Sequence, residues 1–349
     1  MKNQKKTKGK SISWTDSNFQ DTEQSERYPQ EKVRPQKNEN EWDSRKITVP
    51  IEDSENRQKD WNIESAYYSQ YLTSDTHPES IDLREEFPDG IGGYKPWKIH
   101  QQKEGSFSCI GYATTDLVHW YLNRRGFPTT KLSARFNWMA AKEIDSLTAR
   151  PTTFIEQAGS TLKAGLDVCR KYGCVDDVLL PTDEDSSFPG TTQQFYSQAS
   201  KYRIHAYYSL MLPSPTVVSG VVVNGEDKER LQVLVWKKWI AENGPLLVRV
   251  NVDKTFYNAK NELLEDYQEN ESFQKHAALL VGYDEQGFIL RNSWGILWGK
   301  EGYAYLSNKY AFQALDEAYG VVMPSNEVGN PRAPQSHEKS LLEWLLSFI

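Results

Sequence analysis

The spacing of apolar residues predicts three helices in the middle of the chain. Over residues 109–125, apolar side chains recur every four positions, which matches the period of a helix. A second helix is expected over about 161–172, where Ser160 is placed to cap its start and Gly173 follows its end. A third helix is expected over about 227–243. The first half of the globular sequence is therefore predicted to be mainly helical.

After the third helix, short apolar runs replace the helical pattern and predict strands. These runs are Leu246–Val252, Ala277–Tyr283, Phe288–Asn292 and Gly302–Leu306, and turn residues separate them. Helices that come first and strands that come afterwards indicate an α+β fold with two lobes.

The two ends of the chain differ in composition from its middle. The first 60 residues contain 13 basic and 12 acidic side chains and few apolar ones, so they bury too little surface to offset their conformational entropy. We expect residues 1–75 to be disordered and residues 1–60 to be dispensable for chemistry, with a propeptide that covers the active site as the alternative. A globular domain is expected over 76–325, followed by a tail, 326–349, with a nine-residue apolar segment, Leu341–Ile349.

Composition excludes several classes of protein. The net charge of −7 argues against a main role in binding nucleic-acid phosphates. No apolar run approaches the ~18 residues of a membrane span, and no apolar segment follows the basic N-terminus, so neither an anchor nor a signal peptide is expected. Three cysteines in 349 residues do not form a disulfide framework. We therefore expect a cytoplasmic protein.

A cysteine at the start of the first predicted helix is a candidate nucleophile. Cys109 follows several small residues and lies where the helix dipole is positive and backbone N–H groups lack partners. Both features lower the pKa of a thiol and favour the thiolate. The same N–H groups could bind an oxyanion that forms on an attacked carbonyl. A lone cysteine at this place can also be a small buried apolar residue, so the assignment requires a base.

One of the six histidines has a suitable position to act as that base. His119 shares the helix of Cys109 but lies about 15 Å further along the axis. His276 opens a predicted strand, and Asn292 ends the next one. Adjacent antiparallel strands bring these two residues together, so Asn292 can bind one imidazole nitrogen and leave the other to face a thiol.

The stretch HAALLVGYDEQGFILRNSWGILWGKEGYAYL, His276–Leu306, resembles the His and Asn region of papain-like cysteine peptidases. Residues 78–84 resemble the start of the mature domain in that family, and 101–109 resemble its nucleophile loop in a bacterial-type member. The resemblance spans about 78–323. It implies a helical lobe that carries the nucleophile, a β-barrel-like lobe that carries His and Asn, and an active site in the cleft between them. It also implies a monomer that needs no metal or organic cofactor.

The resemblance assigns roles to individual residues. Cys109 would attack a peptide or protein substrate and form a thioester acyl-enzyme, with His276 as acid and base and Asn292 as the orienting group. Trp294 would shield the His–Asn hydrogen bond and contact substrate. In the family, the glutamine that binds the oxyanion lies one position closer to the nucleophile than Gln102 does, where this chain has Lys103. We expect Gln102 to take this role, with Gln101 and Lys103 as alternatives. Further substrate contacts are implied for Gly159, Ser160, Lys275 and Ala277.

Several positions depart from the family pattern. The sequence before the nucleophile reads Ser106-Phe107-Ser108, so the family's neighbouring cysteine is absent, as in proteins of reducing compartments, and Phe107 replaces a glycine. The spacing from Cys109 to His276 is 167 residues, against about 130–150 in papain, which predicts extra structure within 181–227. These departures leave two alternatives open, an inactive peptide-binding protein and acyl transfer to amines. Cys169 and Cys174 lack histidines nearby, so we interpret them as free, partly buried thiols and not as zinc ligands.

Overall fold

The computed structural model describes residues 77–84, 87–88, 94–95, 97–103, 106–125, 131–145, 159–182, 193–218 and 221–324. All of the described residues belong to one compact unit of the chain. The predictions for residues 1–75 and for the tail 326–349 therefore fall outside the described residues. Within the described part, no helix is long and apolar enough to cross a membrane.

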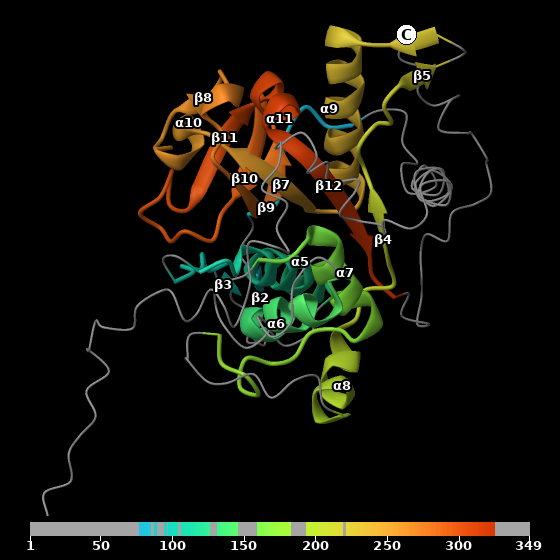
Figure 1. Cartoon of the computed structure of the whole chain (residues 1–349), viewed down its shortest axis with the longest axis vertical. Coiled ribbons are helices and arrows are strands. Elements are labelled where there is room, and N and C mark those ends of the chain that lie inside the picture. The colour runs from blue at the N-terminus through green and yellow to red at the C-terminus, as the bar shows by residue number, and fades with distance from the viewer. Residues whose placement is uncertain are drawn as a thin grey trace, which may run out of the picture. The chain divides into compact units, whose positions relative to one another are not determined.

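The first lobe is a group of helices (Figure 1). Its helices are α5 (Cys109–Arg124), α6 (Ala134–Ile144), α7 (Leu162–Lys171) and the short α8 (Gln193–Ala199), which leads into a 3-10 turn, Ser200–Tyr202. The predictions of α5 and α7 are confirmed to within one residue at each end. The sequence pattern missed α6, which begins after Ser133, whose hydroxyl accepts a hydrogen bond from the backbone N–H of Phe136.

The predicted cap of α7 is wrong by one residue. The side chain of Thr161, not that of Ser160, accepts a hydrogen bond from the backbone N–H of Ala164. The Ser160 hydroxyl instead donates to the carboxylate of Asp145 at 2.8 Å. The C-terminal end is as predicted, because Gly173 adopts a φ of 102°, which side-chain-bearing residues rarely tolerate.

The second lobe is built on an eight-stranded sheet with the order β4-β12-β7-β9-β10-β11-β8, in which β1 also pairs with β9. Its strands are β1 (Ile81–Asp82), β4 (Ala206–Ser209), β7 (Leu246–Val252), β8 (Leu263–Leu264), β9 (Gln274–Tyr283), β10 (Gly287–Arg291), β11 (Tyr303–Ser307) and β12 (Leu315–Val322). The four predicted strands are confirmed, and β7 has the predicted bounds. The sequence pattern missed β4 and β12.

Shorter elements complete the described chain. They are β2 (Phe87–Pro88), β3 (Tyr94–Lys95), the hairpin β5 (Thr216–Val218) and β6 (Val221–Val223), α9 (Gly225–Glu242), α10 (Lys254–Tyr257), a 3-10 turn (Glu269–Glu271) and α11 (Asn308–Ala314). Helix α9 packs Trp236 and Trp239, both fully buried, into a cluster with the sheet. The extra sequence expected within 181–227 contains α8, β4 and the β5–β6 hairpin. Helices and an antiparallel-rich sheet in two lobes confirm the predicted α+β class.

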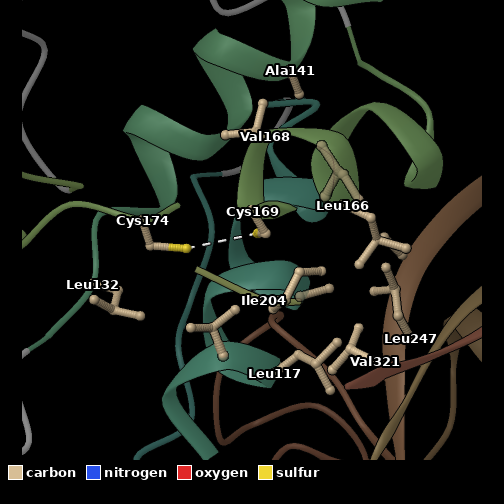
Figure 2. Packing of buried hydrophobic residues seen from close by; sticks show 14 of the residues in the cluster. Leu117, Leu132, Ala141, Leu166, Val168, Cys169, Cys174, Ile204, Leu247 and Val321 are labelled. Carbon is tan, nitrogen blue, oxygen red and sulfur yellow. Dashed lines mark hydrogen bonds between the residues drawn. The ribbon is translucent and has the colours of Figure 1, made fainter. Parts of the chain in front are cut away.

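The two lobes share one apolar core. Figure 2 shows Leu117 and Leu166 from the helices close to Leu247 and Val321 from the sheet, and Val168 further off in the same buried cluster. Cys169 and Cys174 also lie in this cluster as free thiols, with their sulfur atoms 3.7 Å apart (Figure 2). Both cysteines are fully buried, where the sequence suggested only partial burial.

A buried ion pair also joins the lobes. The guanidinium of Arg291, at the end of β10, donates to the carboxylate of Asp116 on α5 at 3.0 Å and to the carbonyls of Trp97 and Lys98. His100 lies 3.1 Å from the same carboxylate. Burial by itself raises the pKa of Asp116, but the positive charge of Arg291 and the contact with His100 outweigh it and lower the pKa to about 2. The carboxylate is therefore ionised at neutral pH and holds α5 against β10.

We expect Asp116→Asn to lower the free energy of unfolding by about 3–5 kcal/mol, because it leaves the buried charge of Arg291 without its counter-ion. Urea unfolding at neutral pH measures this change. Asp82→Asn is the matched control, since the Asp82–Arg84 pair is exposed and its loss should cost less than about 1 kcal/mol. Equal small losses in both variants would contradict a supporting role of the buried pair.

Candidate active site

The candidate nucleophile is the first residue of α5. Cys109 is partly buried, and the backbone groups of Ala277, Ile110 and Cys109 itself lie within hydrogen-bond reach of its thiol. Burial raises the pKa of the thiol, and these three backbone hydrogen bonds oppose the increase only in part. Because Ala277 comes from β9, the thiol lies at the junction of the two lobes.

The candidate base is held by a single short hydrogen bond. Nε2 of His276 lies 2.7 Å from Oδ1 of Asn292, the residue that follows β10. Asn292 Oδ1 also accepts the backbone N–H of Ser293, so it acts as the acceptor and Nε2 must carry the proton. In the neutral ring this leaves Nδ1 as the basic nitrogen. Because Ala277 follows His276 directly, the Ala277 contact places the thiol next to the strand that carries this imidazole.

Aromatic side chains enclose the imidazole. The ring of Trp294 lies 4.5 Å from that of His276, and the ring of Phe256 lies 6.5 Å away, measured between ring centroids. Burial lowers the pKa of His276 to about 4, although the hydrogen bond to Asn292 favours the charged form. Trp294 was predicted next to the His276 ring from the sequence, whereas Phe256, which belongs to the short helix α10, was not.

The electrostatics of the thiol and the imidazole depend on each other. Burial disfavours each charge when it is considered alone, since the pKa of the thiol is raised and that of the imidazole is lowered. A proton transfer from the thiol to the imidazole creates two opposite charges side by side, so each one offsets the desolvation of the other. The N-terminus of α5 adds a positive partial charge at the sulfur.

The loop before Cys109 places Gln102 beside the Asn292–Ser293 segment. The backbone N–H of Gln102 donates to Ser293 O at 2.8 Å, and the Ser293 hydroxyl donates to Gln102 Oε1 at 2.9 Å. Gln102 Nε2 therefore faces the other way and donates to Ser106 O at 3.1 Å. Gln101 forms a β-bridge with Trp294, and Lys103 is exposed. Ser293 was not singled out from the sequence, although it lies inside the Asn-Ser-Trp-Gly pattern.

The other predicted contact residues are more dispersed. Ala277 is buried beside the thiol, whereas Lys275 is exposed and donates to Asp316 at 3.2 Å. A Cβ built on Gly159 would lie 3.6 Å from Cβ of Phe107, so these two residues are neighbours. The hydrogen bond of the Ser160 hydroxyl to Asp145 makes it part of the loop structure that precedes α7.

A charged group that the sequence analysis missed lies on the β7 and β12 side of His276. Arg249 is the β7 partner of Ala277 and binds both oxygens of Asp316 at 2.7 Å. It also lies 2.5 Å from Glu317, whose pKa burial raises to about 7 although the charge of Arg249 opposes the increase. The β7 partner of His276 itself is the buried Val250, so Arg249 and Ala277 lie on the opposite face of the sheet from the imidazole.

The two-lobed α+β fold is that of a papain-like structure, and comparisons agree. Residues 211–322 match the sequence model of the papain family cysteine proteases. A viral cathepsin of the Cydia pomonella granulosis virus is 40% identical over 108 residues, which cover 27% of this chain and 29% of that protein. Mouse cathepsin F is 39% identical over 75 residues, 20% of this chain and 16% of that protein.

A solved structure extends the likeness to both lobes. Xylellain, a cysteine protease from Xylella fastidiosa, superposes with a TM-score of 0.55 at 19% identity, over 74% of this chain and 90% of that one. At this identity the superposition shows the fold. The matched segments span less than a third of the length of the two cathepsins. The chain thus resembles the papain-like cysteine proteases in part of its sequence and in its fold, and the resemblance predicted from its sequence is confirmed.

The coupling of the thiol and the imidazole can be measured by NMR titration of the His276 ring. In Cys109→Ala no thiolate is present, and we expect His276 to titrate near pH 4 because burial disfavours its charge. In the wild type the neighbouring thiolate should raise the pKa of the imidazole above that value.

His276→Gln identifies the resonance, and Cys169→Ala serves as the control that should titrate as the wild type does. Identical titration of His276 in the wild type and in Cys109→Ala would contradict the pairing of these two side chains.

Proposed function

We propose that this protein hydrolyses peptide bonds as a cysteine peptidase, with Cys109 as nucleophile, His276 as acid and base, and Asn292 as the orienting residue. The observation that carries the proposal is the 2.7 Å bond from His276 Nε2 to Asn292 Oδ1, on a strand whose next residue, Ala277, contacts a thiol at the N-terminus of a helix. That bond fixes the tautomer that leaves Nδ1 available to the thiol. All three residues come from one chain, so the proposed reaction needs no second subunit and suits a monomer.

The proposed reaction has two stages. The Cys109 sulfur attacks the carbonyl carbon of a peptide bond while its proton resides on His276, and the resulting oxyanion is bound by hydrogen-bond donors. His276 then gives its proton to the departing amine, the C–N bond breaks, and a thioester remains on Cys109. Water attacks the thioester with His276 as base, which releases the acid and restores the thiol.

We assign the oxyanion donors to the backbone N–H of Cys109 and the side chain of Gln102. An amide nitrogen carries two hydrogens, so the bond from Gln102 Nε2 to Ser106 O leaves one hydrogen to donate. The Ser293 hydroxyl binds Oε1 and so keeps the NH₂ group directed away from Ser293. Lys103 is exposed and would offer a less fixed charge, which favours Gln102.

Peptide binding without turnover is the second candidate function. Phe107, two residues before the nucleophile, is 50% exposed and lies against Gly159. A bulky ring at that place narrows the space for a substrate backbone. Acyl transfer to amines has less support, because the third member of the site is the neutral Asn292 and not an aspartate.

The central test is the loss of peptide hydrolysis in Cys109→Ala and in His276→Ala, since each removes a group that makes or breaks a bond. Turnover of a fluorogenic peptide and covalent labelling by an epoxide thiol inhibitor measure it. The wild type should react with the epoxide and Cys109→Ala should not.

The matched controls are Cys169→Ala and Cys174→Ala, which remove thiols of the buried core and should keep turnover. Near-wild-type hydrolysis by Cys109→Ala would overturn the proposal. Epoxide labelling without measurable turnover would favour the peptide-binding alternative.

We expect Gln102→Ala to lower kcat by about 10²–10³ and to leave KM nearly unchanged, because the side chain binds charge that develops only in the transition state. Steady-state kinetics of the three single variants Gln101→Ala, Gln102→Ala and Lys103→Ala measures this. A silent Gln102→Ala together with a crippled variant at either neighbouring position would show that another residue is the donor.

A further inference from the structure

Two buried cysteines face each other at the C-terminal end of α7. Cys169 lies in the last turn of the helix, and Cys174 lies five residues further along the chain. Their sulfur atoms are 3.7 Å apart and lie toward one another in Figure 2, and both residues are fully buried. A disulfide has a sulfur–sulfur distance of about 2.05 Å, so the two sulfurs need to approach by about 1.7 Å to form one.

The turn after α7 brings Cys174 back over the end of the helix. Gly173 has a φ of 102°, and its backbone N–H donates to Val168 O at 2.8 Å, so the chain reverses directly after the helix. The backbone N–H of Cys174 then donates to Tyr202 O at 3.2 Å, in the 3-10 turn after α8. Backbone hydrogen bonds therefore set the position of Cys174 relative to the helix.

The sulfur of Cys169 is held by the other two large helices of the lobe. Nδ2 of Asn137, on α6, donates to this sulfur at 3.2 Å. Oδ1 of the same amide accepts the hydroxyl of Thr114, on α5, at 2.6 Å. The backbone N–H of Ile204 donates to Cys169 O at 3.2 Å. The fold thus fixes both cysteines separately and leaves their sulfurs in contact.

We propose that Cys169 and Cys174 are a redox modification site, at which a small disulfide compound oxidises the two thiols to an intramolecular disulfide across the end of α7 without distorting the core. The described residues contain no group of three or more His, Cys, Asp or Glu side chains that could hold a metal ion, which favours a disulfide over a zinc site for this pair. The proposal concerns the helical lobe and does not depend on the proposed peptidase function.

The oxidation is a thiol–disulfide exchange in two steps, here written for glutathione disulfide. The Cys174 thiol, which lies in the turn outside the helix, loses its proton and attacks one sulfur of the reagent, which gives a mixed disulfide and one glutathione thiolate. The Cys169 sulfur then loses its proton, attacks the Cys174 sulfur and displaces the second glutathione. The two protons of the protein thiols end on the two released glutathiones, so the protein loses two electrons and the reagent gains them.

Burial determines from which state the exchange proceeds. In the closed core, the hydrogen bond with Cys169 and burial raise the pKa of Cys174, so the thiolate that exchange requires is disfavoured. The exchange therefore proceeds from molecules in which the end of α7 has opened locally. After the helix end closes again, the core covers the disulfide and shields it from reductants.

The test incubates the folded full chain with an excess of glutathione disulfide, with and without urea at a concentration below the unfolding transition. The protein is then denatured, alkylated, digested with trypsin and analysed by mass spectrometry. Arg170 and Lys171 lie between the two cysteines, so trypsin separates Cys169 from Cys174 and only a disulfide keeps their peptides together. We expect these linked peptides in the wild type, faster with urea than without it, and their loss after treatment with dithiothreitol.

Cys109→Ala is the matched control, because it removes the thiol at the start of α5 and leaves the pair intact. It should give the linked peptides in the same yield as the wild type, whereas Cys174→Ala should give none. In the Cys109→Ala protein, the bond should also raise the Tm on the order of 5 °C, because it restrains the unfolded chain. Thermal unfolding of the oxidised and the reduced form measures this shift.

Each remaining outcome counts against the site. Absence of linked peptides in the wild type, both with and without urea, would overturn the proposal. Glutathione bound to Cys174 without a link to Cys169 would overturn it as well, because the second step would then not occur. Linked peptides together with an unchanged or lower Tm would show that the bond distorts the core, and would contradict the claim that the fold holds the two thiols in position for it.

Discussion

The buried contact between Arg291 and Asp116 is the constraint on which the site depends. Arg291 directly precedes Asn292 in the chain, and Asp116 lies on the same helix as Cys109, two turns further along. One ion pair therefore relates the orienting residue of one lobe to the nucleophile of the other. Apolar contacts between the lobes supply most of the attraction, but they are non-directional. The guanidinium of Arg291 prescribes position as well, because its donors have fixed directions and two of its nitrogens lie within 3.0 Å of Oδ2 of Asp116.

The interface between the lobes also explains how a buried thiol and a buried imidazole can become charged, although burial favours their neutral forms. Thiol and imidazole lie at the edge of the shared core, where water is largely excluded and each charge is costly. Three features offset this cost, namely the partial charge at the start of α5, the backbone groups around the sulfur, and the carbonyl of Asn292 on the imidazole. Each depends on the other lobe or on a helix end. The reactive state is therefore a property of the assembled lobes, and neither lobe provides it alone.

The elements that the sequence predicted are those with a local signal. Strand β7 is a continuous apolar run, and Gly173 marks the end of α7, so both follow from neighbouring residues. Helix α6 was missed because it is buried on nearly all sides, including Arg135, Asn137 and Lys142, so it lacks the apolar stripe of a surface helix. Strand β12 was missed because its second and third residues are Asp316 and Glu317, whose partner Arg249 lies 67 residues before Asp316. A pairing of residues so far apart in the chain produces no pattern among neighbouring residues, so it cannot be predicted from them.

The candidate site divides in the same way. His276 and Asn292 could be paired from the sequence, because two neighbouring strands and one turn connect them. The ring contacts among Tyr257, Phe273 and Trp294 could not be predicted, because Tyr257 comes from α10, Phe273 from the residue before β9, and Trp294 from the loop after β10. Sheet order and register determine which of these residues meet. His276 pairs with the apolar Val250 on β7, whereas its ring lies 4.5 Å from that of Trp294 after β10. The residues around the thiol and the imidazole can differ while these two reactive groups stay the same. Selectivity can therefore differ among proteins that share this fold.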